Sequence, residues 1–348
     1  MKILTHFFYN PHINPVDNKI YPPPMDWKLA LKLMDSNIPD EMLGFFTKKC
    51  IGDFPNTYTF TKNLGENLVN DHSHLFPIII AKPSIIVFSL MEPEPSYVET
   101  YYGITGLSAF WGTGLMRTTY SNPDVHFDVV FLDLVVNLTL IKAAHMSLNP
   151  RKENPQVQLI CSKDIHKFGL CTKNMKRTMS KYPFDKSIWY HGRIVLTTCY
   201  VYFVLRVIFY QIIPSLMLDQ LMKSFGVKPM LMALQRKSFL GNKEIAFFAF
   251  HSFPNTGITD KQELKELAEN TDFTITRHIF CLETEEGRKE IYNKFVLGCR
   301  RFLLNESDET LPYARIKMKA MKWIDWMATK SVHLVIAYIV YIYVKSFL

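Results

Sequence analysis

The chain has 348 residues, of which 48% are hydrophobic and 14% aromatic, and it carries a formal net charge of +8. This length allows two domains with a sizeable core, and so apolar a composition excludes an intrinsically disordered chain. The basic residues are scattered rather than arranged in a stripe, which disfavours nucleic acid as a partner. Six widely spaced cysteines form no C-x-x-C pair and no set of zinc ligands, so we expect reduced thiols and no bound metal.

Apolar runs alternate with helical patterns over the first 162 residues. We predict buried strands and helices in the following order: strand 2–9, helices 27–34 and 40–50, a helix from about Tyr58 to Val69, strand 76–84, an amphipathic helix within 127–146 and strand 156–162. The strands are continuously apolar rather than alternating, which is typical of a parallel sheet covered on both faces. The predicted fold class is therefore α/β.

The character of the sequence changes after about residue 190. Residues 193–225 form a long apolar stretch that Arg206, Gln211 and Pro214 interrupt, and most of the remainder is predicted to be helical. A second, α-rich domain is therefore expected to begin there. We predict three parts, namely residues 1–190, residues 191–330 and an apolar tail at 331–348.

Among the occurrences of the pattern Tyr-x-x-x-Lys are those that start at Tyr58, Tyr182 and Tyr341. Pro183 disfavours helical angles at the residue before it, so the second pair is not expected to share a helix face. The third lies in the apolar tail. Of these three, only Tyr58 is followed by apolar residues at helical spacing, which places it and Lys62 together on another face. An ammonium group one turn away favours the phenolate, so this tyrosine could protonate a carbonyl oxygen; the alternative is a surface tyrosine beside a solvated lysine.

Several ordered segments show a resemblance to a known family. These segments are YPPPMD (21–26), FPNTYTFTKNLGENLV (54–69), AKPSIIVFSLMEPEP (81–95), GLMRTTYSNPDVHFDVVFLDLVVNLTL (114–140) and LGCRRFLLNESDETLPYARIKMKAMKWIDW (297–326). In this order they resemble successive motifs of the alcohol-forming fatty acyl-CoA reductases. That family combines an extended short-chain dehydrogenase domain of Rossmann-like type with a helical C-terminal domain, which the resemblance assigns to 1–190 and 191–330.

The resemblance implies a role for each residue of the first pair. Tyr58 would be the acid toward the carbonyl oxygen, while Lys62 would lower its pKa and hydrogen-bond the nicotinamide ribose, so both would also contact the cofactor. The family's catalytic serine aligns with Thr5, whose hydroxyl can still donate to the oxyanion. The family's arginine before Pro-Ser is Lys82 here.

The implied reaction reduces a long-chain fatty acyl-CoA to a bound aldehyde and then to a primary alcohol, with NADPH as hydride donor and release of CoA. Family members begin with a strand and a glycine-rich turn that seats the dinucleotide pyrophosphate, and this sequence shows no such turn. We therefore expect the first half of the cofactor domain to be missing. Two functions stay open, a reductase and a noncatalytic, membrane-associated acyl-binding remnant. A short-chain dehydrogenase acting on steroids or sugars is a third, which the C-terminal domain disfavours.

Two segments suggest a lipid membrane as a partner. Residues 332–344 are apolar apart from His333, but at about 1.5 Å per residue they cover roughly 20 Å, less than the roughly 30 Å hydrocarbon core. The alternative is a C-terminal helix docked on the protein core. Residues 194–218 are long enough to span, although Arg206 near their middle favours an interfacial or partly buried helix. We predict attachment to the endoplasmic reticulum or a peroxisome, with the apolar C-terminal helix inserted and the catalytic region in the cytosol.

Overall fold

The computed structural model describes residues 2–5, 18–54, 56–148, 155–161, 166–246 and 284–345. Its contacts divide the chain into two compact units: unit 1 contains Met1–Pro95, Asp124–Phe168 and His251–Arg288, and unit 2 contains Ser96–Pro123, Gly169–Phe250 and Lys289–Leu348. Each unit is considered by itself. The domain boundaries predicted at residues 190 and 330 rest on the sequence pattern and stay a prediction.

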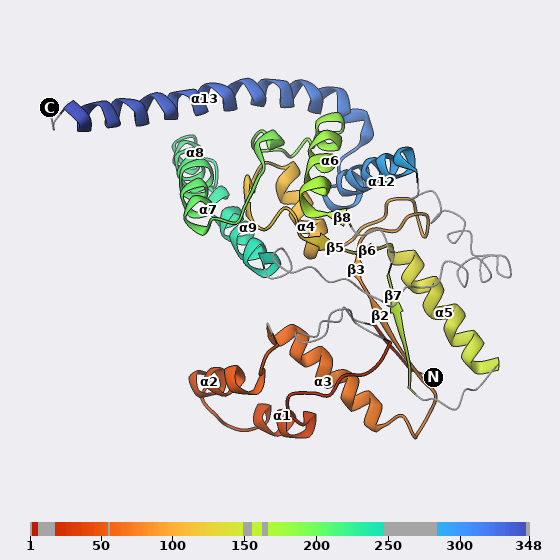
Figure 1. The fold of residues 1–348 in the computed structure, drawn as a ribbon. Helices are drawn as coiled ribbons and strands as arrows, with labels where there is room; N and C mark the ends of the chain where they lie inside the picture. The colour runs from red at the N-terminus through yellow and green to blue at the C-terminus, as the bar shows by residue number, and fades with distance from the viewer. Residues whose placement is uncertain are drawn as a thin grey trace. The chain divides into compact units, whose positions relative to one another are not determined.

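A three-stranded parallel sheet forms the centre of unit 1 (Figure 1). Strand β2 (Ile78–Pro83) lies between β1 (Lys2–Thr5) and β7 (Gln156–Ile160). The register places Thr5 of β1 beside Ala81 of β2. All three strands lie where the apolar runs predict them, so the α/β class with a parallel sheet is confirmed; residues 6–9 and 162 of the predicted strands lie outside the described residues.

Both faces of β2 are covered, because successive side chains of a strand point to opposite faces and every residue of this strand is buried. On one face, Ile79 packs with Ala143 and Met146 of helix α5 (Leu132–Leu148). On the other face, Lys82 contacts Glu66 of helix α3 (Thr57–Asp71). The two helices therefore cover opposite faces of the sheet (Figure 1).

Helix α5 is present as predicted, but its polar and apolar faces are not those of a simple amphipathic helix. Val136 and Leu140 are exposed, whereas Asp133 is buried. The reason is local: the carboxylate of Asp133 accepts hydrogen bonds from the main-chain N–H groups of residues 90–92, at 2.8–3.2 Å. The N–H groups of this loop need an acceptor, and they take it from the inner face of the helix.

The described residues of unit 1 also form two further helices and two short strand pairs. Helices α1 (Trp27–Met34) and α2 (Asp40–Cys50) have the predicted bounds, and the Asp26 side chain caps α1 by accepting from the N–H of Lys28 at 2.8 Å. The strand pairs are β3 (Ile85–Ile86) with β6 (Val129–Val130), and β5 (His126–Phe127) with β8 (His166–Lys167).

Unit 2 is mostly helical, as predicted for the second half of the chain. A parallel pair of strands, β4 (Thr118–Tyr120) and β9 (Val195–Thr197), is surrounded by helices. The helices are α4 (Gly103–Gly112), α6 (Phe168–Lys181), α7 (Tyr200–Val207), α8 (Ile213–Ser224), α9 (Leu231–Ala246), α12 (Glu285–Gly298) and α13 (Leu311–Lys345), with 3-10 turns η1 (His191–Arg193) and η5 (Asp308–Thr310) and π-helical segments η2 (Ile208–Ile212) and η4 (Cys299–Leu303).

Helices α7, η2 and α8 are continuous and form a 25-residue helix, Tyr200–Ser224, whose length and composition would suffice to cross a membrane. One row of its residues, four apart, is nonetheless buried in unit 2; the row consists of Phe203, Val207, Gln211, Ser215 and Asp219. The predicted apolar tail is not a separate element, because residues 331–345 are the last part of α13.

Candidate functional site

Helix α3 begins with a polar cap. The side-chain oxygen of Asn56 accepts a hydrogen bond from the N–H of Thr59 at 2.9 Å, which satisfies one of the otherwise free N–H groups of the first turn. The cap fixes the start of the helix one residue after Asn56. Tyr58 therefore lies in the first turn, and Lys62 lies one turn further along.

Tyr58 and Lys62 do project from one face of α3. The Lys62 Nζ atom lies 5.6 Å from the centroid of the Tyr58 ring, and 45% of Tyr58 is exposed, while Lys62 is half-buried. A phenol that a substrate can reach, with a cation one turn away, has the arrangement needed for a proton donor toward a carbonyl oxygen. The shared face is observed, and the catalytic role stays a prediction.

The second Tyr-x-x-x-Lys pair has a different setting. Helix α6 ends at Lys181, so Tyr182 and Lys186 do not share a helix, as Pro183 predicts. The Lys186 side chain donates to the main-chain oxygen of Leu304. This pair therefore contributes to packing within unit 2.

The face of α3 that points toward the sheet is polar and buried. Asn63 and Asn67 both donate to the main-chain oxygen of Tyr21, at 3.1 and 3.0 Å. Glu66 lies between them in sequence and forms an ion pair of 2.8 Å with Lys82 of β2; neither side chain is exposed. These contacts fix the rotation of α3 about its own axis and thereby direct Tyr58 away from the sheet.

Lys82 stands where the resemblance expects an arginine, and the structure gives it a structural partner. Its Nζ donates to the main-chain oxygen of Lys19 at 2.8 Å and lies 5.7 Å from the Tyr21 ring centroid. Burial lowers the pKa of Lys82, and the charge and hydrogen bond of Glu66 oppose that shift. The sequence analysis did not predict the ion pair between Lys82 and Glu66. The signal that could have indicated it is a lysine at the end of a continuously apolar strand, because a buried lysine requires a counter-charge.

Thr5 is the last residue of β1, beside Ala81 and so next to Lys82 in the register. Its side chain is outside what the structure describes. The candidate site in unit 1 therefore consists of an observed pair, Tyr58 and Lys62, and a threonine whose part in the site stays a prediction.

Unit 2 contains a second buried charge cluster. Asp325 of α13 accepts from Trp189 Nε1 at 2.6 Å and pairs with the guanidinium groups of Arg117 and, at 2.6 Å, Arg193. Arg117 also donates to the main-chain oxygen of Tyr210 at 3.2 Å. This cluster joins α13 and η2 through one arginine, and its residues lie too far apart in the sequence for any local pattern to predict them.

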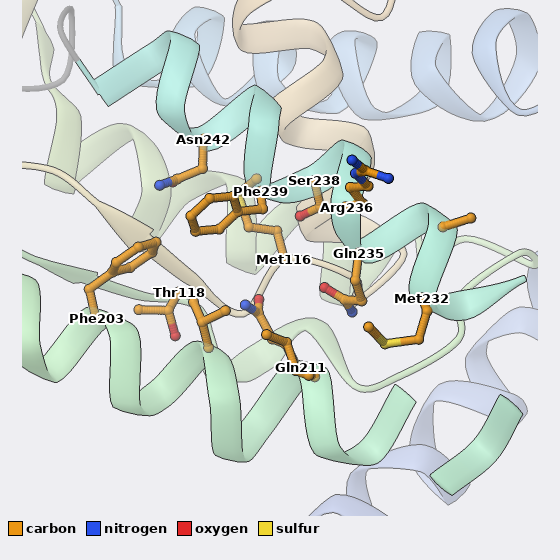
Figure 2. Close-up of a pocket in the computed structure, with 13 residues that line it drawn as sticks. Met116, Thr118, Phe203, Gln211, Met232, Gln235, Arg236, Ser238, Phe239 and Asn242 are labelled. Atoms are coloured by element: carbon orange, nitrogen blue, oxygen red, sulfur yellow. The ribbon is translucent and has the colours of Figure 1, made fainter. Parts of the chain in front are cut away.

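The described residues of each unit also line a largely apolar, open cavity. In unit 1, helices α1, α2 and α3 line a cavity of about 480 Å³. In unit 2, residues from α7, η2, α9 and the β4 region line a cavity of about 510 Å³, shown in Figure 2.

The chain is similar in sequence to a family model and to several curated proteins. Residues 3–139 match a family model described as Male sterility protein, an NAD-binding family. Fatty acyl-CoA reductase 2 of Mus musculus is 26% identical over 94% of this chain and 63% of its own length. Fatty acyl-CoA reductase wat of Drosophila melanogaster is 24% identical over 100% of this chain and 67% of its own length. Fatty acyl-CoA reductase 1 of Xenopus laevis is 26% identical over 88% of this chain and 59% of its own length.

The parallel sheet defines an α/β fold, and the part of the chain that contains β1 and β2 is similar to a family of NAD-binding proteins. More narrowly, the curated proteins to which the chain is similar are named fatty acyl-CoA reductases. It spans about three fifths of the length of the curated relatives that it matches.

Proposed function

We propose that this chain takes part in the NADPH-dependent reduction of a long-chain fatty acyl-CoA to a primary alcohol through a bound aldehyde. The observation that supports this proposal is the Tyr58–Lys62 pair, which lies on an accessible face of α3 in a chain similar to proteins of this name. The overall balance is one acyl-CoA, two hydrides and two protons to one alcohol and one CoA thiol.

The residues of the chain would handle the proton and the oxygen atom. As the aldehyde carbon is reduced, the Tyr58 hydroxyl would give its proton to the oxygen, which becomes the alcohol hydroxyl. The ammonium group of Lys62 would stabilise the resulting phenolate. The Thr5 hydroxyl would donate a hydrogen bond to the developing oxyanion.

NADPH, when bound, supplies the hydride. The residues described fit the nicotinamide ribose, because Lys62 is half-buried on the face that Tyr58 shares, where one hydroxyl could bond both side chains. Lys62 and Tyr58 would therefore hold that ribose. The same two residues would set both the position of the cofactor and the protonation state of the acid.

The test is alcohol formation from acyl-CoA by the chain alone and by its fusion to the segment of a relative that carries a glycine-rich dinucleotide-binding turn. Tyr58→Phe should abolish turnover, and Lys62→Ala should lower it by about 10²-fold or more. Tyr182→Phe and Lys186→Ala are the matched controls and should leave turnover nearly unchanged. Loss of activity in the control pair but not the first would refute the site. A fusion without activity that still binds acyl-CoA would favour the noncatalytic acyl-binding alternative.

We also propose that the protein is held on an organelle membrane, the endoplasmic reticulum or a peroxisome, with its catalytic region in the cytosol. The helix Tyr200–Ser224 supports attachment along the surface rather than across the bilayer. Its inner row is packed into unit 2, and Arg206 bonds Thr118 Oγ1 at 3.1 Å and lies 4.8 Å from the Tyr210 ring centroid. Its outer side exposes large apolar side chains, namely Val201, Leu205, Phe209, Met217 and Leu221.

A helix whose inner row packs into the protein and whose outer side is apolar can lie along a membrane with that outer side in the interface. Phe209→Glu combined with Met217→Glu should therefore release the chain from membranes in a carbonate wash, whereas Gln220→Glu, at an exposed polar position, should not. Deletion of residues 331–348 measures the part played by the end of α13. A full-length chain recovered wholly in the soluble fraction would refute membrane attachment.

A further inference from the structure

Helices α6 and α13 of unit 2 present charge of one sign to solvent. The sequence of α6 contains no acid, and that of α13 contains a single one, Asp325. The Asp325 carboxylate is buried and already pairs with Arg117 and Arg193. The exposed charge of both helices is therefore entirely positive.

Packing within unit 2 determines which side of α13 is exposed. The ion pair between Asp325 and Arg117 fixes the rotation of the helix about its own axis, because the carboxylate has to point inward to reach the guanidinium. The buried side consists of Ala314, Met318, Asp325 and Thr329, each of which is at most 6% exposed. The remaining side of the helix stays open to solvent.

The exposed side of α13 combines cations with tryptophans. It contains Arg315, Lys319, Lys322, Trp323 and Trp326, and we call this set the basic–aromatic face. Each of the two lysines lies four residues before a tryptophan, so a lysine and an indole are neighbours on the helix surface. Trp323 is 67% exposed, and the ring centroids of the two tryptophans lie 6.1 Å apart. The face thus offers positive charge and large apolar surface side by side.

The end of α6 adds to this positive charge. The Arg315 Nε atom donates to the main-chain oxygen of Lys181 at 3.1 Å, which places the end of α6 beside the start of α13 (Figure 1). Arg177 and Lys181 are exposed on α6 and lie one turn apart. Basic residues that are 134 positions apart in the sequence are therefore neighbours in the fold.

We propose that the basic–aromatic face, together with the end of α6, docks on the anionic phospholipids of a membrane surface. Lysine and arginine side chains complement negatively charged headgroups. Tryptophan is enriched at the level of the headgroups, because its ring is apolar and its N–H group is polar. The inference rests on the proposed membrane attachment, to which it adds the class of lipid and a second contact that recognises it.

The packing of α13 favours a membrane over an acidic protein as the partner. A protein that recognises a basic amphipathic helix receives the apolar side of that helix in a groove. In α13 the side that contains Ala314 and Met318 is already covered by unit 2, so it is not open to such a groove. A membrane is a planar surface and needs only the exposed side.

The experiment measures binding of the full chain to vesicles by flotation, with phosphatidylcholine alone and with phosphatidylserine added. Neutral vesicles report attachment through apolar side chains, whereas the gain in affinity with phosphatidylserine reports the basic residues. Lys319→Gln combined with Lys322→Gln should lower the affinity for phosphatidylserine vesicles by about thirtyfold and leave that for neutral vesicles unchanged. High salt should also reduce the gain, because it screens exposed charges.

Lys48→Gln combined with Lys49→Gln is the matched control. Both lysines are exposed on α2, and the double change alters the net charge of the chain by the same amount. It should leave binding to both types of vesicle unchanged. Trp323→Ala combined with Trp326→Ala should weaken binding to both types, since an indole enters the interface of a neutral membrane as well.

The outcomes separate this inference from membrane attachment itself. Equal binding to the two types of vesicle, or lysine variants of α13 that bind phosphatidylserine vesicles as tightly as the α2 control, would overturn the lipid class and leave attachment intact. Lysine-dependent binding to phosphatidylserine vesicles without any binding to neutral ones would support the inference and refute attachment through the apolar side of Tyr200–Ser224. Polyglutamate binding that the α13 lysine variants lose, while they retain phosphatidylserine binding, would assign the face to an acidic protein instead.

Discussion

The ion pair between Glu66 and Lys82 is predicted to decide whether α3, with Tyr58 and Lys62, is held in place on the sheet. The perturbation is a pair of substitutions, Glu66→Leu and Lys82→Met, made singly and together. Each single change removes one member of this ion pair at a place where no part of either side chain reaches solvent. The double change leaves two apolar side chains in contact.

The expected magnitudes follow from the environment of the pair. Removal of one partner of a buried ion pair typically costs about 3–5 kcal/mol, whereas replacement of both by apolar residues is often nearly neutral. In Glu66→Leu, Lys82 would retain the main-chain oxygen of Lys19 and the ring of Tyr21, neither of which carries a negative charge. We therefore expect each single variant to be destabilised by about 3–5 kcal/mol and the double variant by about 1 kcal/mol or less.

Hydrogen–deuterium exchange measures this locally, in peptides that cover residues 57–71 and 78–83. A loss of about 3–5 kcal/mol corresponds to exchange that is roughly a hundred- to several-thousandfold faster. Lys167→Met is the control within unit 1, because its pair with Asp124 is exposed and should contribute about 1 kcal/mol or less. A double variant that exchanges as fast as the single variants would refute the reasoning, since it would mean that packing rather than charge pairing holds α3.

Three further predictions concern unit 2. Burial, with a smaller effect of the Lys176 charge, lowers the pKa of His191 to about 4, so this histidine is neutral in the fold. The free energy of unfolding should therefore be highest above pH 6.5 and should fall by about 3 kcal/mol as the pH drops toward 4. Denaturant titrations at several pH values measure this dependence, which His191→Gln should remove. Asp325→Ala should destabilise unit 2 by about 3–5 kcal/mol in the same titrations, whereas Asp308→Ala, which breaks an exposed pair, should cost about 1 kcal/mol or less; equal effects would contradict the assigned burial. Asp219→Ala should lower the free energy of unfolding by about 1–2 kcal/mol, because the Asp219 carboxylate accepts from three N–H groups at the start of α9. Hydrogen exchange of those amides should accelerate, and unchanged exchange would show that water satisfies them equally well.

The sequence by itself determined the elements whose signal is local. The apolar run at 78–83 gave a buried strand and the pattern at 27–34 gave a helix, because a side-chain period of two or of 3.6 residues is already present in the order of residues. It also placed Tyr58 and Lys62 on one face, since residues four apart on a helix are neighbours whatever surrounds them. Pro183 likewise predicted, from the sequence alone, that Tyr182 and Lys186 do not share a helix.

Only the tertiary structure decided which partners the buried polar groups have and which side of an apolar helix faces the protein. Lys82 and Glu66 belong to different elements, and Arg117 meets Asp325 across 208 positions of sequence, so no periodicity could pair them. Residues 200–224 are apolar on most sides, and a pattern without a polar face cannot show which row is buried. Packing against β4 and α9 buries the row that contains Phe203 and Gln211, because these side chains fill space next to them and Gln211 bonds the main chain. The opposite side of the helix stays exposed, and the space that remains between the helices is the cavity.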